Sequence, residues 1–357
     1  MRVLFVIHEL SLNGAVTTLV SQVRHLVAAG ARVTVVTPEL EGAAAALRAD
    51  ILAAGATLVT ETTTDEHDVA VGCTIFAADA LAGMVGRLPL VWRIHEGLAG
   101  ARYVLADPKA LALLSAVDKL VFPSRGAVER MWAPLLSGLP PGRVAVVPPL
   151  LPPPEPGDAA PKAAGRKRVL CVGSIEPRKR QGDLVRAMAI FAPTAPVECV
   201  LVGERLQLDP PVDAIVAAHP ERFILPGALP PAEVQRLYRS ADIFALPSGD
   251  ESLAQTPIQA ALHGVPVVLS DLDCYDGVWK HGVNALLHPV GEVELLAWYL
   301  SMLIASPTLG RRLASAALGV AAGFGPAHTT ALFAALLEGV AAQRAGRRAE
   351  GDDHTTR

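Results

Sequence analysis

Short apolar runs alternate with alanine-rich stretches along almost the whole chain. Runs of Val, Ile and Leu predict buried strands at residues 2–7, 32–37, 69–71, 90–94, 119–122 and 144–147, with the clearest helices between them at 15–29 and 43–54. Further strands are expected at 168–172, 198–202, 223–225, 243–246, 265–269 and 285–287. Continuous apolar strands separated by helices are typical of a parallel sheet with helices on both faces. Because the alternation occurs twice, we predict an α/β protein with two such sheets.

A proline-rich segment at 148–167 interrupts this pattern and predicts a stiff, extended connection. We therefore place Rossmann-like domains at 1–150 and 168–325, joined by a linker at 151–167 and facing each other across a cleft. A helix at 326–345 is expected to pack back on the first domain. The polar tail at 346–357 is expected to be disordered.

Composition excludes several classes of protein. A net charge of −4 gives no global attraction to nucleic acid or to an anionic membrane. Alanine supplies much of the 51% hydrophobic content, and no uninterrupted apolar run approaches the roughly 18 residues of a spanning helix. The opening residues are interpreted as a first strand and not as a signal peptide. The four cysteines form no CxxC pair, which favours a reducing, cytoplasmic setting without structural zinc.

The segment 243–271 carries the most informative chemistry. It predicts a strand, a polar turn, a helix over about 253–262, a glycine stop and a second strand, which together make one βαβ unit. Asp250 and Glu251 precede the helix, whose first backbone N–H groups favour an anion such as phosphate. A carboxylate beside a phosphate site could accept hydrogen bonds from a sugar carried on that phosphate. The simpler interpretation is that both acids only cap the helix.

Other polar loops follow predicted strands. Residues 173–182 place Arg178, Lys179 and Arg180 side by side at a strand end, which indicates either a nearby anion or three solvated cations. In the first half, Gly14 opens a helix in a loop without the GxGxxG dinucleotide pattern. His95 comes directly after a strand, where an imidazole is either a structural hydrogen-bonding group or a contact for protons and phosphate.

These motifs together resemble the retaining GT-B glycosyltransferases of family four, also called group 1. The resemblance rests on GSIEPRK after the first strand of the second half and on ESLAQTPIQAALHGVPVVLSD near its end. That family has an E-x7-E pattern followed by glycine and a PVV strand. Here Glu251 matches the first acid, Gly264 matches the glycine, and Gln259 replaces the second acid. An amide still donates and accepts hydrogen bonds, although a carboxylate is the stronger acceptor.

The resemblance implies a role for each matching position. Glu251 would contact hydroxyls of the donor sugar, and Lys179 would neutralise the leaving diphosphate. His95 would line the catalytic centre as the third catalytic residue. The remaining donor-binding positions are Gly14, Ser174 in place of a family arginine, Arg178 as a substitute cation, the amides of Leu253 and Ala254, and Gln259 at the ribose.

We therefore expect a sugar transfer from a nucleoside-diphosphate sugar, used as co-substrate without any other cofactor or metal. Asp271 and Asp273 form a D-x-D string but are interpreted as loop acids. The acceptor is left open among a glycan, a lipid-linked compound and a small molecule. Peripheral contact of the protein with the inner face of a membrane is left open as well. Two alternatives remain: a catalytically degenerate nucleotide-binding or scaffolding subunit, and a sugar phosphorylase or epimerase on the same fold.

Overall fold

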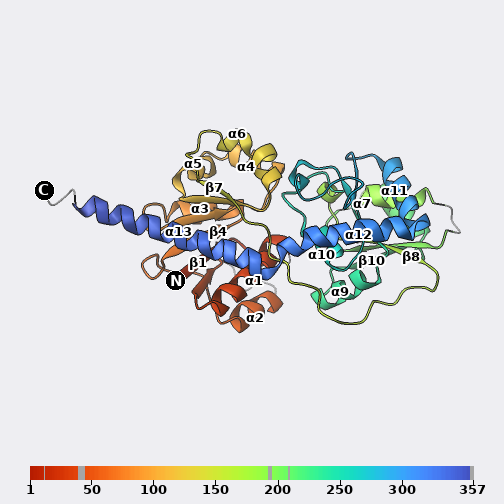
Figure 1. Cartoon of the computed structure of the whole chain (residues 1–357), viewed down its shortest axis with the longest axis horizontal. Helices are drawn as coiled ribbons and strands as arrows, with labels where there is room; N and C mark the ends of the chain where they lie inside the picture. The colour runs from red at the N-terminus through yellow and green to blue at the C-terminus, as the bar shows by residue number, and fades with distance from the viewer. Residues whose placement is uncertain (12, 39–44, 192–194, 208–209, 354–357) are drawn as a thin grey trace. The chain divides into compact units, whose positions relative to one another are not determined.

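The computed structural model describes residues 1–11, 13–38, 45–191, 195–207 and 210–353, with side chains described as far as residue 343. It divides into two compact units, which are considered separately (Figure 1). Unit 1 comprises Met1–Pro152 together with Phe324–Arg357, and unit 2 comprises Pro153–Gly323. The chain therefore leaves unit 1, builds the whole of unit 2 and then returns to unit 1.

Unit 1 is built on a seven-stranded sheet in which every pairing is parallel. Its strand order is β3-β2-β1-β4-β5-β6-β7. The strands are β1 (Arg2–Ile7), β2 (Arg32–Val36), β3 (Thr57–Val59), β4 (Val69–Cys73), β5 (Leu90–Arg93), β6 (Lys119–Phe122) and β7 (Val144–Val146). The order reverses beside β1, so the loops after β1 and β4 open at the point where ligands bind in such sheets.

Helices cover both faces of this sheet because the side chains of each strand alternate between two apolar clusters. In β1, Val3 and Phe5 point into the cluster formed with α1 (Gly14–Ala28), α2 (Ala45–Ala53) and α13 (Pro326–Asp353). Leu4 and Val6 point into the cluster on the opposite face. That second cluster also contains α3 (Ala78–Ala82), α4 (Leu98–Ala106), α5 (Pro108–Ala116) and α6 (Ala133–Leu136).

The returning helix α13 is part of the core of unit 1. Phe333, Leu337 and Val340 are buried with the strands of the sheet. The Arg93 guanidinium, itself 1% exposed, lies 5.2 Å from the Phe333 ring centroid and donates to the carbonyls of Val147 (3.2 Å) and Pro148 (3.3 Å). One buried arginine thus joins β5, the segment that leaves unit 1 and the helix that returns to it.

Unit 2 repeats the architecture with six parallel strands in the order β10-β9-β8-β11-β12-β13. The strands are β8 (Lys167–Val172), β9 (Val197–Val202), β10 (Phe223–Gly227), β11 (Ile243–Leu246), β12 (Val267–Ser270) and β13 (Leu286–His288). Its helices are α7 (Gln181–Ala189), α8 (Pro210–Ala218), α9 (Pro231–Ser240), α10 (Gln255–Leu262), α11 (Val293–Ala305) and α12 (Pro307–Ala321). The reversal beside β8 brings the loops after β8 and β11 to one edge of the sheet.

The proline-rich segment is bound along unit 2. Arg239 donates to the carbonyls of Asp158 (3.0 Å) and Glu155 (2.9 Å), and the Lys162 ammonium pairs with Asp242 at 2.5 Å. Most of the segment has no regular secondary structure, as its prolines predict, but its carbonyl groups are engaged by unit 2.

Two elements differ from the sequence-based expectation. The short edge strand β3 was not predicted, because Thr57–Val59 is too brief to give an apolar run. Helix α13 continues to Asp353, into the region where the sequence predicts disorder, while residues 354–357 lie outside the described part of the chain.

The predicted helix at 43–54 is described only from Ala45 onward. One continuous helical run, Pro307–Gln343, is long and apolar enough to cross a bilayer by length and composition, and 28% of its most apolar window is buried. Within this run, Leu313 and Phe333 are each buried at 1% exposure or less, so part of its apolar surface is packed against protein.

Candidate functional site

The central segment of unit 2 forms the expected βαβ unit of β11, α10 and β12. All four residues of β11 are buried, because this strand lies in the middle of the sheet. The loop that follows turns Glu251 into the protein, where it is 8% exposed, next to Ser248, which is fully buried. A carboxylate at this depth needs charged or hydrogen-bonding partners to remain ionised.

Lys179 supplies the principal partner from the loop after β8. Its Nζ lies 2.5 Å from Glu251 Oε1, and the Ser248 hydroxyl donates to the same oxygen at 2.9 Å. Arg178 Nη1 lies 3.5 Å from Glu251 Oε2. Burial alone would raise the Glu251 pKa, but the charges of Lys179 and Arg178 outweigh it and hold the pKa below its ordinary value. The structure thus joins Glu251 and Lys179, which are 72 residues apart.

The sequence around Lys179 fixes its direction. Lys179 ends a short 3-10 turn, Pro177–Lys179, and its side chain runs over Gly173, where a Cβ would lie 3.6 Å from the lysine Cε. Gly173 and Gly203 pack so closely that a Cβ on Gly203 would approach the Gly173 carbonyl oxygen to 2.0 Å. Glycine at 203 is therefore required for the loops after β8 and β9 to meet. Gly173, over which the Lys179 side chain runs, is held in this contact.

Ser174 and Arg178 are linked through a neighbouring acid. The Ser174 hydroxyl donates to Glu176 Oε1 at 2.8 Å, and Arg178 Nη2 donates to the same oxygen at 2.8 Å. Arg178 also donates to the backbone carbonyl of Asp250 at 2.8 Å. This network aims the Arg178 guanidinium at the loop that carries Glu251.

Helix α10 begins at Gln255, two residues after the predicted start. Ala254 occupies the N-cap position without a side-chain hydrogen bond to the helix, and both Leu253 and Ala254 are buried. The start of the helix thus follows the Glu251 loop within four residues, and a helix start of this kind favours an anion. Gln259 lies one turn further on and is half-buried, and its carbonyl accepts from His263 Nδ1 at 2.8 Å.

In unit 1, candidate groups meet at the carboxyl ends of β1, β4 and β5. Glu96 Oε2 accepts backbone hydrogen bonds from His95 (2.9 Å) and Ile75 (3.2 Å), which ties two loops together. Burial raises the Glu96 pKa to about 7, despite these hydrogen bonds. Burial, followed by the positive charge of Arg93, lowers the His95 pKa well below its ordinary value, so the imidazole is neutral at physiological pH.

Gly14, the other predicted position in unit 1, is the first residue of α1. The preceding Asn13 caps that helix, because its side-chain oxygen accepts from the Val16 amide at 3.0 Å. His95 and Gly14 thus belong to loops on the same edge of the unit 1 sheet. The other predicted site residues all belong to unit 2.

Sequence reasoning missed Thr74. This residue follows β4 with φ of 74°, a conformation that is rare for a β-branched side chain and costs about 1–3 kcal/mol. Its carbonyl accepts from Trp92 Nε1 at 2.8 Å, and its hydroxyl lies 3.1 Å from His8 Nδ1. Strained residues of this kind cluster at functional sites. No feature of the sequence distinguishes this threonine from an ordinary one.

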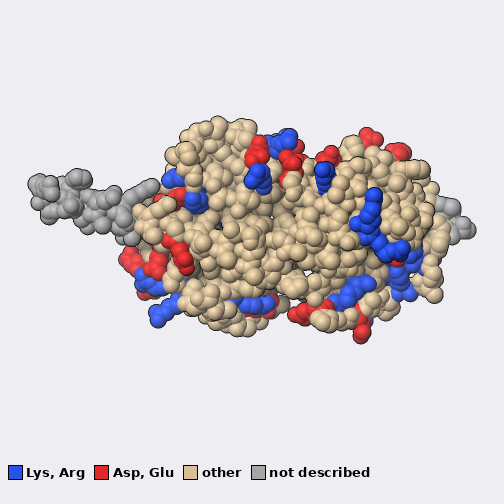
Figure 2. Space-filling model, viewed as in Figure 1, with Lys and Arg blue, Asp and Glu red and all other residues tan. Residues whose placement is uncertain are grey.

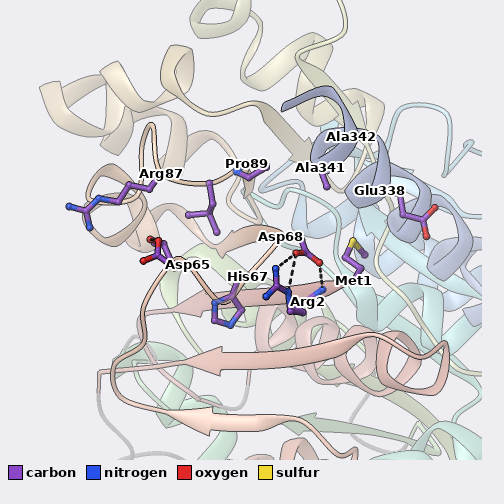
Figure 3. A pocket seen from close by; sticks show the side chains of 12 residues that line it. Met1, Arg2, Asp65, His67, Asp68, Arg87, Pro89, Glu338, Ala341 and Ala342 are labelled. Atoms are coloured by element: carbon purple, nitrogen blue, oxygen red, sulfur yellow. Dashed lines mark hydrogen bonds and ion pairs between the residues drawn. The ribbon is translucent and has the colours of Figure 1, made fainter. Parts of the chain in front are cut away.

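A cavity of about 850 Å³ lies elsewhere in unit 1. It opens at the amino ends of the strands, where Figure 3 shows Arg2 paired with Asp68 at one wall and Glu338 of α13 at another. The Arg2 guanidinium is already engaged by both hydrogen bonds to Asp68 Oδ1 (2.6 and 3.0 Å). The cavity is on the edge of the sheet opposite to the candidate residues, and its mixed charges identify no ligand.

Charged side chains and possible metal ligands were considered as signs of a second site among the described residues. Figure 2 shows Lys and Arg interspersed with Asp and Glu on the face in view, with wide uncharged areas between them. Within the described residues, no three His, Cys, Asp or Glu side chains gather closely enough to hold a metal ion.

The sequence matches two family models over most of its length. Residues 158–319 match "Glycosyl transferases group 1", and residues 1–134 match "Glycosyl-transferase family 4". A D-inositol 3-phosphate glycosyltransferase of Nocardia farcinica is 30% identical over 283 residues, which cover 70% of this chain and 62% of that protein. This chain thus spans less than two thirds of that relative. The corresponding protein of Mycolicibacterium gilvum is 32% identical over 322 residues, covering 75% of this chain and 69% of its own length.

The fold is likewise similar to solved structures. The crystal structure of Anabaena HepE in complex with UDP-glucose superimposes with a TM-score of 0.79 over 95% of this chain and 100% of that chain. The sequence identity is 19%, so this likeness concerns the fold. Two parallel sheets covered by helices, in the arrangement named GT-B, are thus common to both proteins.

Proposed function

Because this chain belongs to the group 1 glycosyltransferases of family 4 type, we propose that it transfers a sugar from a nucleoside-diphosphate donor to an acceptor hydroxyl, with retention of anomeric configuration. The observation that carries the proposal is the Lys179–Glu251 pair beside the start of α10. It provides a cation for phosphate and a buried carboxylate for sugar hydroxyls, at the edge of the sheet where ligands bind.

In the proposed complex, Lys179 turns from Glu251 to the diphosphate, and the backbone amides at Leu253 and Ala254 contact the same group. Glu251 then accepts hydrogen bonds from sugar hydroxyls, with Ser248 and Arg178 keeping it ionised. The bond between the anomeric carbon and the diphosphate breaks, and its electron pair leaves with the phosphate oxygen. The acceptor oxygen bonds to the same face of that carbon, and its proton passes to the departing phosphate. Lys179 and the helix start stabilise the charge that develops there.

Three further assignments complete the proposal. Arg178 substitutes for the cation that Ser174 lacks, since its guanidinium already lies against the Glu251 loop. Gln259 contacts the ribose as an amide. Gly14 lets the donor phosphate and the acceptor approach the first loop of unit 1, and His95 lines the catalytic centre near the sugar, where its neutral imidazole can take part in a hydrogen bond. The proposal uses no metal ion.

The comparisons suggest which donor and which acceptor to test first. HepE is described with UDP-glucose, so a UDP-sugar is the first donor to test, and the curated relatives make D-inositol 3-phosphate the first acceptor. The four cysteines are free and buried, which supports a reducing compartment, and we propose the cytoplasm.

A thermal-shift titration with UDP, GDP, ADP and TDP tests nucleotide binding, because a ligand that binds the folded state raises its melting temperature. We expect one nucleotide to raise it, and Lys179→Ala to abolish the shift. Lys280→Ala is the matched control, since Lys280 is an exposed lysine of the same unit. The proposal fails if no nucleotide binds or if Lys179→Ala binds as well as the control.

Turnover and stereochemistry need a second measurement. With the donor chosen by the titration, proton NMR of the product reports whether the anomeric configuration matches that of the donor. Nucleotide binding without turnover on any acceptor would instead favour a degenerate binding subunit, for which the replacements at Ser174 and Gln259 are the specific support. Product formation from inorganic phosphate, or from the donor alone, would favour a phosphorylase or an epimerase.

A further inference from the structure

Three aromatic side chains contact one another at the carboxyl edge of the unit 1 sheet, with ring planes inclined at 49° between His8 and Phe76 and at 63° between Phe76 and Tyr103. The His8 and Phe76 ring centroids lie 4.8 Å apart, and the Phe76 and Tyr103 centroids lie 5.5 Å apart. His8 follows β1, Phe76 lies in the 3-10 turn Ile75–Ala77 after β4, and Tyr103 lies in α4 after β5. We refer to His8, Phe76 and Tyr103 as the aromatic shelf.

The shelf faces solvent. Phe76 is 52% exposed and Tyr103 is 48% exposed, although large rings are ordinarily placed where their area is buried. Burial lowers the His8 pKa despite the nearby Glu9 carboxylate, so the third ring is uncharged at neutral pH. The rings interact with one another, and Phe76 and Tyr103 leave about half of their surface available to a ligand, whereas the His8 side chain is 29% exposed.

Hydrogen-bonding groups border the shelf directly. The strained Thr74 places its hydroxyl 3.1 Å from His8 Nδ1, and Glu96 binds the Ile75 amide, one residue before Phe76. At the other side of the imidazole, Glu9 Oε1 lies 3.6 Å from His8 Nε2. The Thr74 hydroxyl and the Glu9 carboxylate thus lie close to the His8 ring, and Glu96 is hydrogen-bonded to the backbone next to Phe76.

Exposed aromatic rings beside hydrogen-bonding oxygen groups indicate which class of ligand fits the aromatic shelf. A membrane-binding surface is expected to combine apolar side chains with clustered lysines and arginines. The groups at the shelf are instead the Glu9 and Glu96 carboxyls and the Thr74 hydroxyl, which suit the hydroxyl-bearing part of a ligand that donates several hydrogen bonds. A cyclic polyol has this composition, because its C–H face packs on an aromatic ring while its hydroxyls point outward to acceptors.

We propose that the aromatic shelf binds the acceptor, and that the acceptor presents a polyhydroxylated six-membered ring, either a pyranose or a cyclitol. The inference rests on the proposed function and extends it by naming the class of acceptor and the residues that select it. Phe76 and Tyr103 hold the ring face, while Thr74 and Glu96 accept or exchange hydrogen bonds at its edge. The shelf lies on the same sheet edge as His95.

Saturation-transfer NMR provides the test, with methyl α-D-glucopyranoside, methyl α-D-mannopyranoside and myo-inositol as probes and no nucleotide present. We expect at least one of them to bind the wild-type protein. Phe76→Ala and Tyr103→Ala should each weaken that binding by about 3- to 10-fold, the range of a single aromatic contact. Tyr103→Phe should bind within 2-fold of wild type if the ring face is what matters.

Leu105→Ala is the matched control, because Leu105 lies on the same helix as Tyr103 and is 60% exposed. It should bind within 2-fold of wild type, and melting temperatures should show that every variant is folded. The inference is wrong if none of the three probes binds, or if removing both rings leaves the affinity unchanged. It is also wrong if the ring variants lose binding to vesicles of 7:3 phosphatidylcholine and phosphatidylglycerol but keep their affinity for the probes.

The outcome is separable from that of the proposed function. Ring binding concerns unit 1 and needs no donor, whereas the nucleotide titration concerns Lys179 in unit 2. A protein that binds the ring probes but no nucleoside diphosphate would refute the proposed transfer reaction and leave the shelf as a ring-binding site. A protein that binds a nucleoside diphosphate but none of the ring probes would retain the nucleotide proposal and refute the assignment of the aromatic shelf to the acceptor.

Discussion

Replacing Glu251 by Gln should strengthen the binding of a nucleoside diphosphate, whereas Lys179→Met should weaken it. In the free protein, Glu251 holds the lysine at 2.5 Å, so a diphosphate must compete with the carboxylate for the same ammonium group. The two side chains are only 9% and 13% exposed, which places their interaction near the buried end of the range for ion pairs. We take its contribution as about 1–2 kcal/mol, which corresponds to roughly 5- to 30-fold in affinity.

The same substitutions should have unequal effects on folding. After Lys179→Met, Glu251 keeps Arg178 at 3.5 Å and Ser248 at 2.9 Å, so we expect a loss of about 1–2 kcal/mol. Glu251→Gln removes the carboxylate from a lysine whose side chain is only 13% exposed, and we expect a loss of about 2–3 kcal/mol. The ionised Glu251 stabilises the fold above its ordinary pKa of 4.5, and this contribution disappears as pH falls through its lower folded pKa.

Isothermal titration calorimetry with UDP measures the affinities, and urea unfolding at pH 7 measures the stabilities. The explanation requires opposite changes in nucleotide affinity for the two variants. If Glu251→Gln weakens UDP binding as much as Lys179→Met does, Glu251 is not a competitor of the phosphate. If Glu251→Gln unfolds at the same urea concentration as wild type, the pair contributes nothing to the fold, and our account of its energetics is wrong.

Three other changes give independent checks. Thr74→Gly should be more stable to urea than Thr74→Ala by about 1 kcal/mol, because both lose the hydroxyl but only glycine relieves the positive φ; equal stabilities would contradict the strain. The Glu96 pKa is raised to about 7, so the folded protein keeps a proton on this carboxyl that the unfolded chain releases near pH 4.5. The free energy of unfolding of wild type should therefore fall by about 1–3 kcal/mol as pH rises from 4.5 to 7. Urea titrations of Glu96→Gln should lack this pH dependence. Gln259→Glu should tighten UDP binding about 3- to 10-fold in calorimetry if this position contacts the ribose, and an unchanged affinity would exclude that contact.

The sequence predicted most strands because a strand buried on both faces must be apolar throughout. The β11 run, with four buried residues, is the clearest example. The edge strand β3 has no such requirement, since one side pairs with β2 and its residues are only partly buried. Helix boundaries were less exact, as the two-residue difference at the start of α10 illustrates.

The candidate site was likewise predictable in part. The carboxyl-end rule for parallel sheets brought the Lys179 and Glu251 loops together in the prediction, and the structure places their charged atoms in contact. The rule did not reveal that Ser248 and Arg178 share the carboxylate, because such contacts depend on the path of a loop. The backbone conformation of Thr74 and the edge-to-face contact of Phe76 with Tyr103 could not be predicted either, because the identity of a single residue determines neither its conformation nor its exposure.

The order of the two units along the chain determines which of them can complete its core first during biosynthesis. Unit 2 is complete once Gly323 has left the ribosome, whereas unit 1 still lacks the helix that contributes Phe333, Leu337 and Val340 to its core. Until the whole of unit 2 has been made, the cluster that α1 and α2 form on one face of the unit 1 sheet therefore lacks these three side chains. Although its strands precede unit 2 in the chain, unit 1 is therefore the second of the two units to complete its core, and termination near residue 324 would destabilise unit 1 more than unit 2.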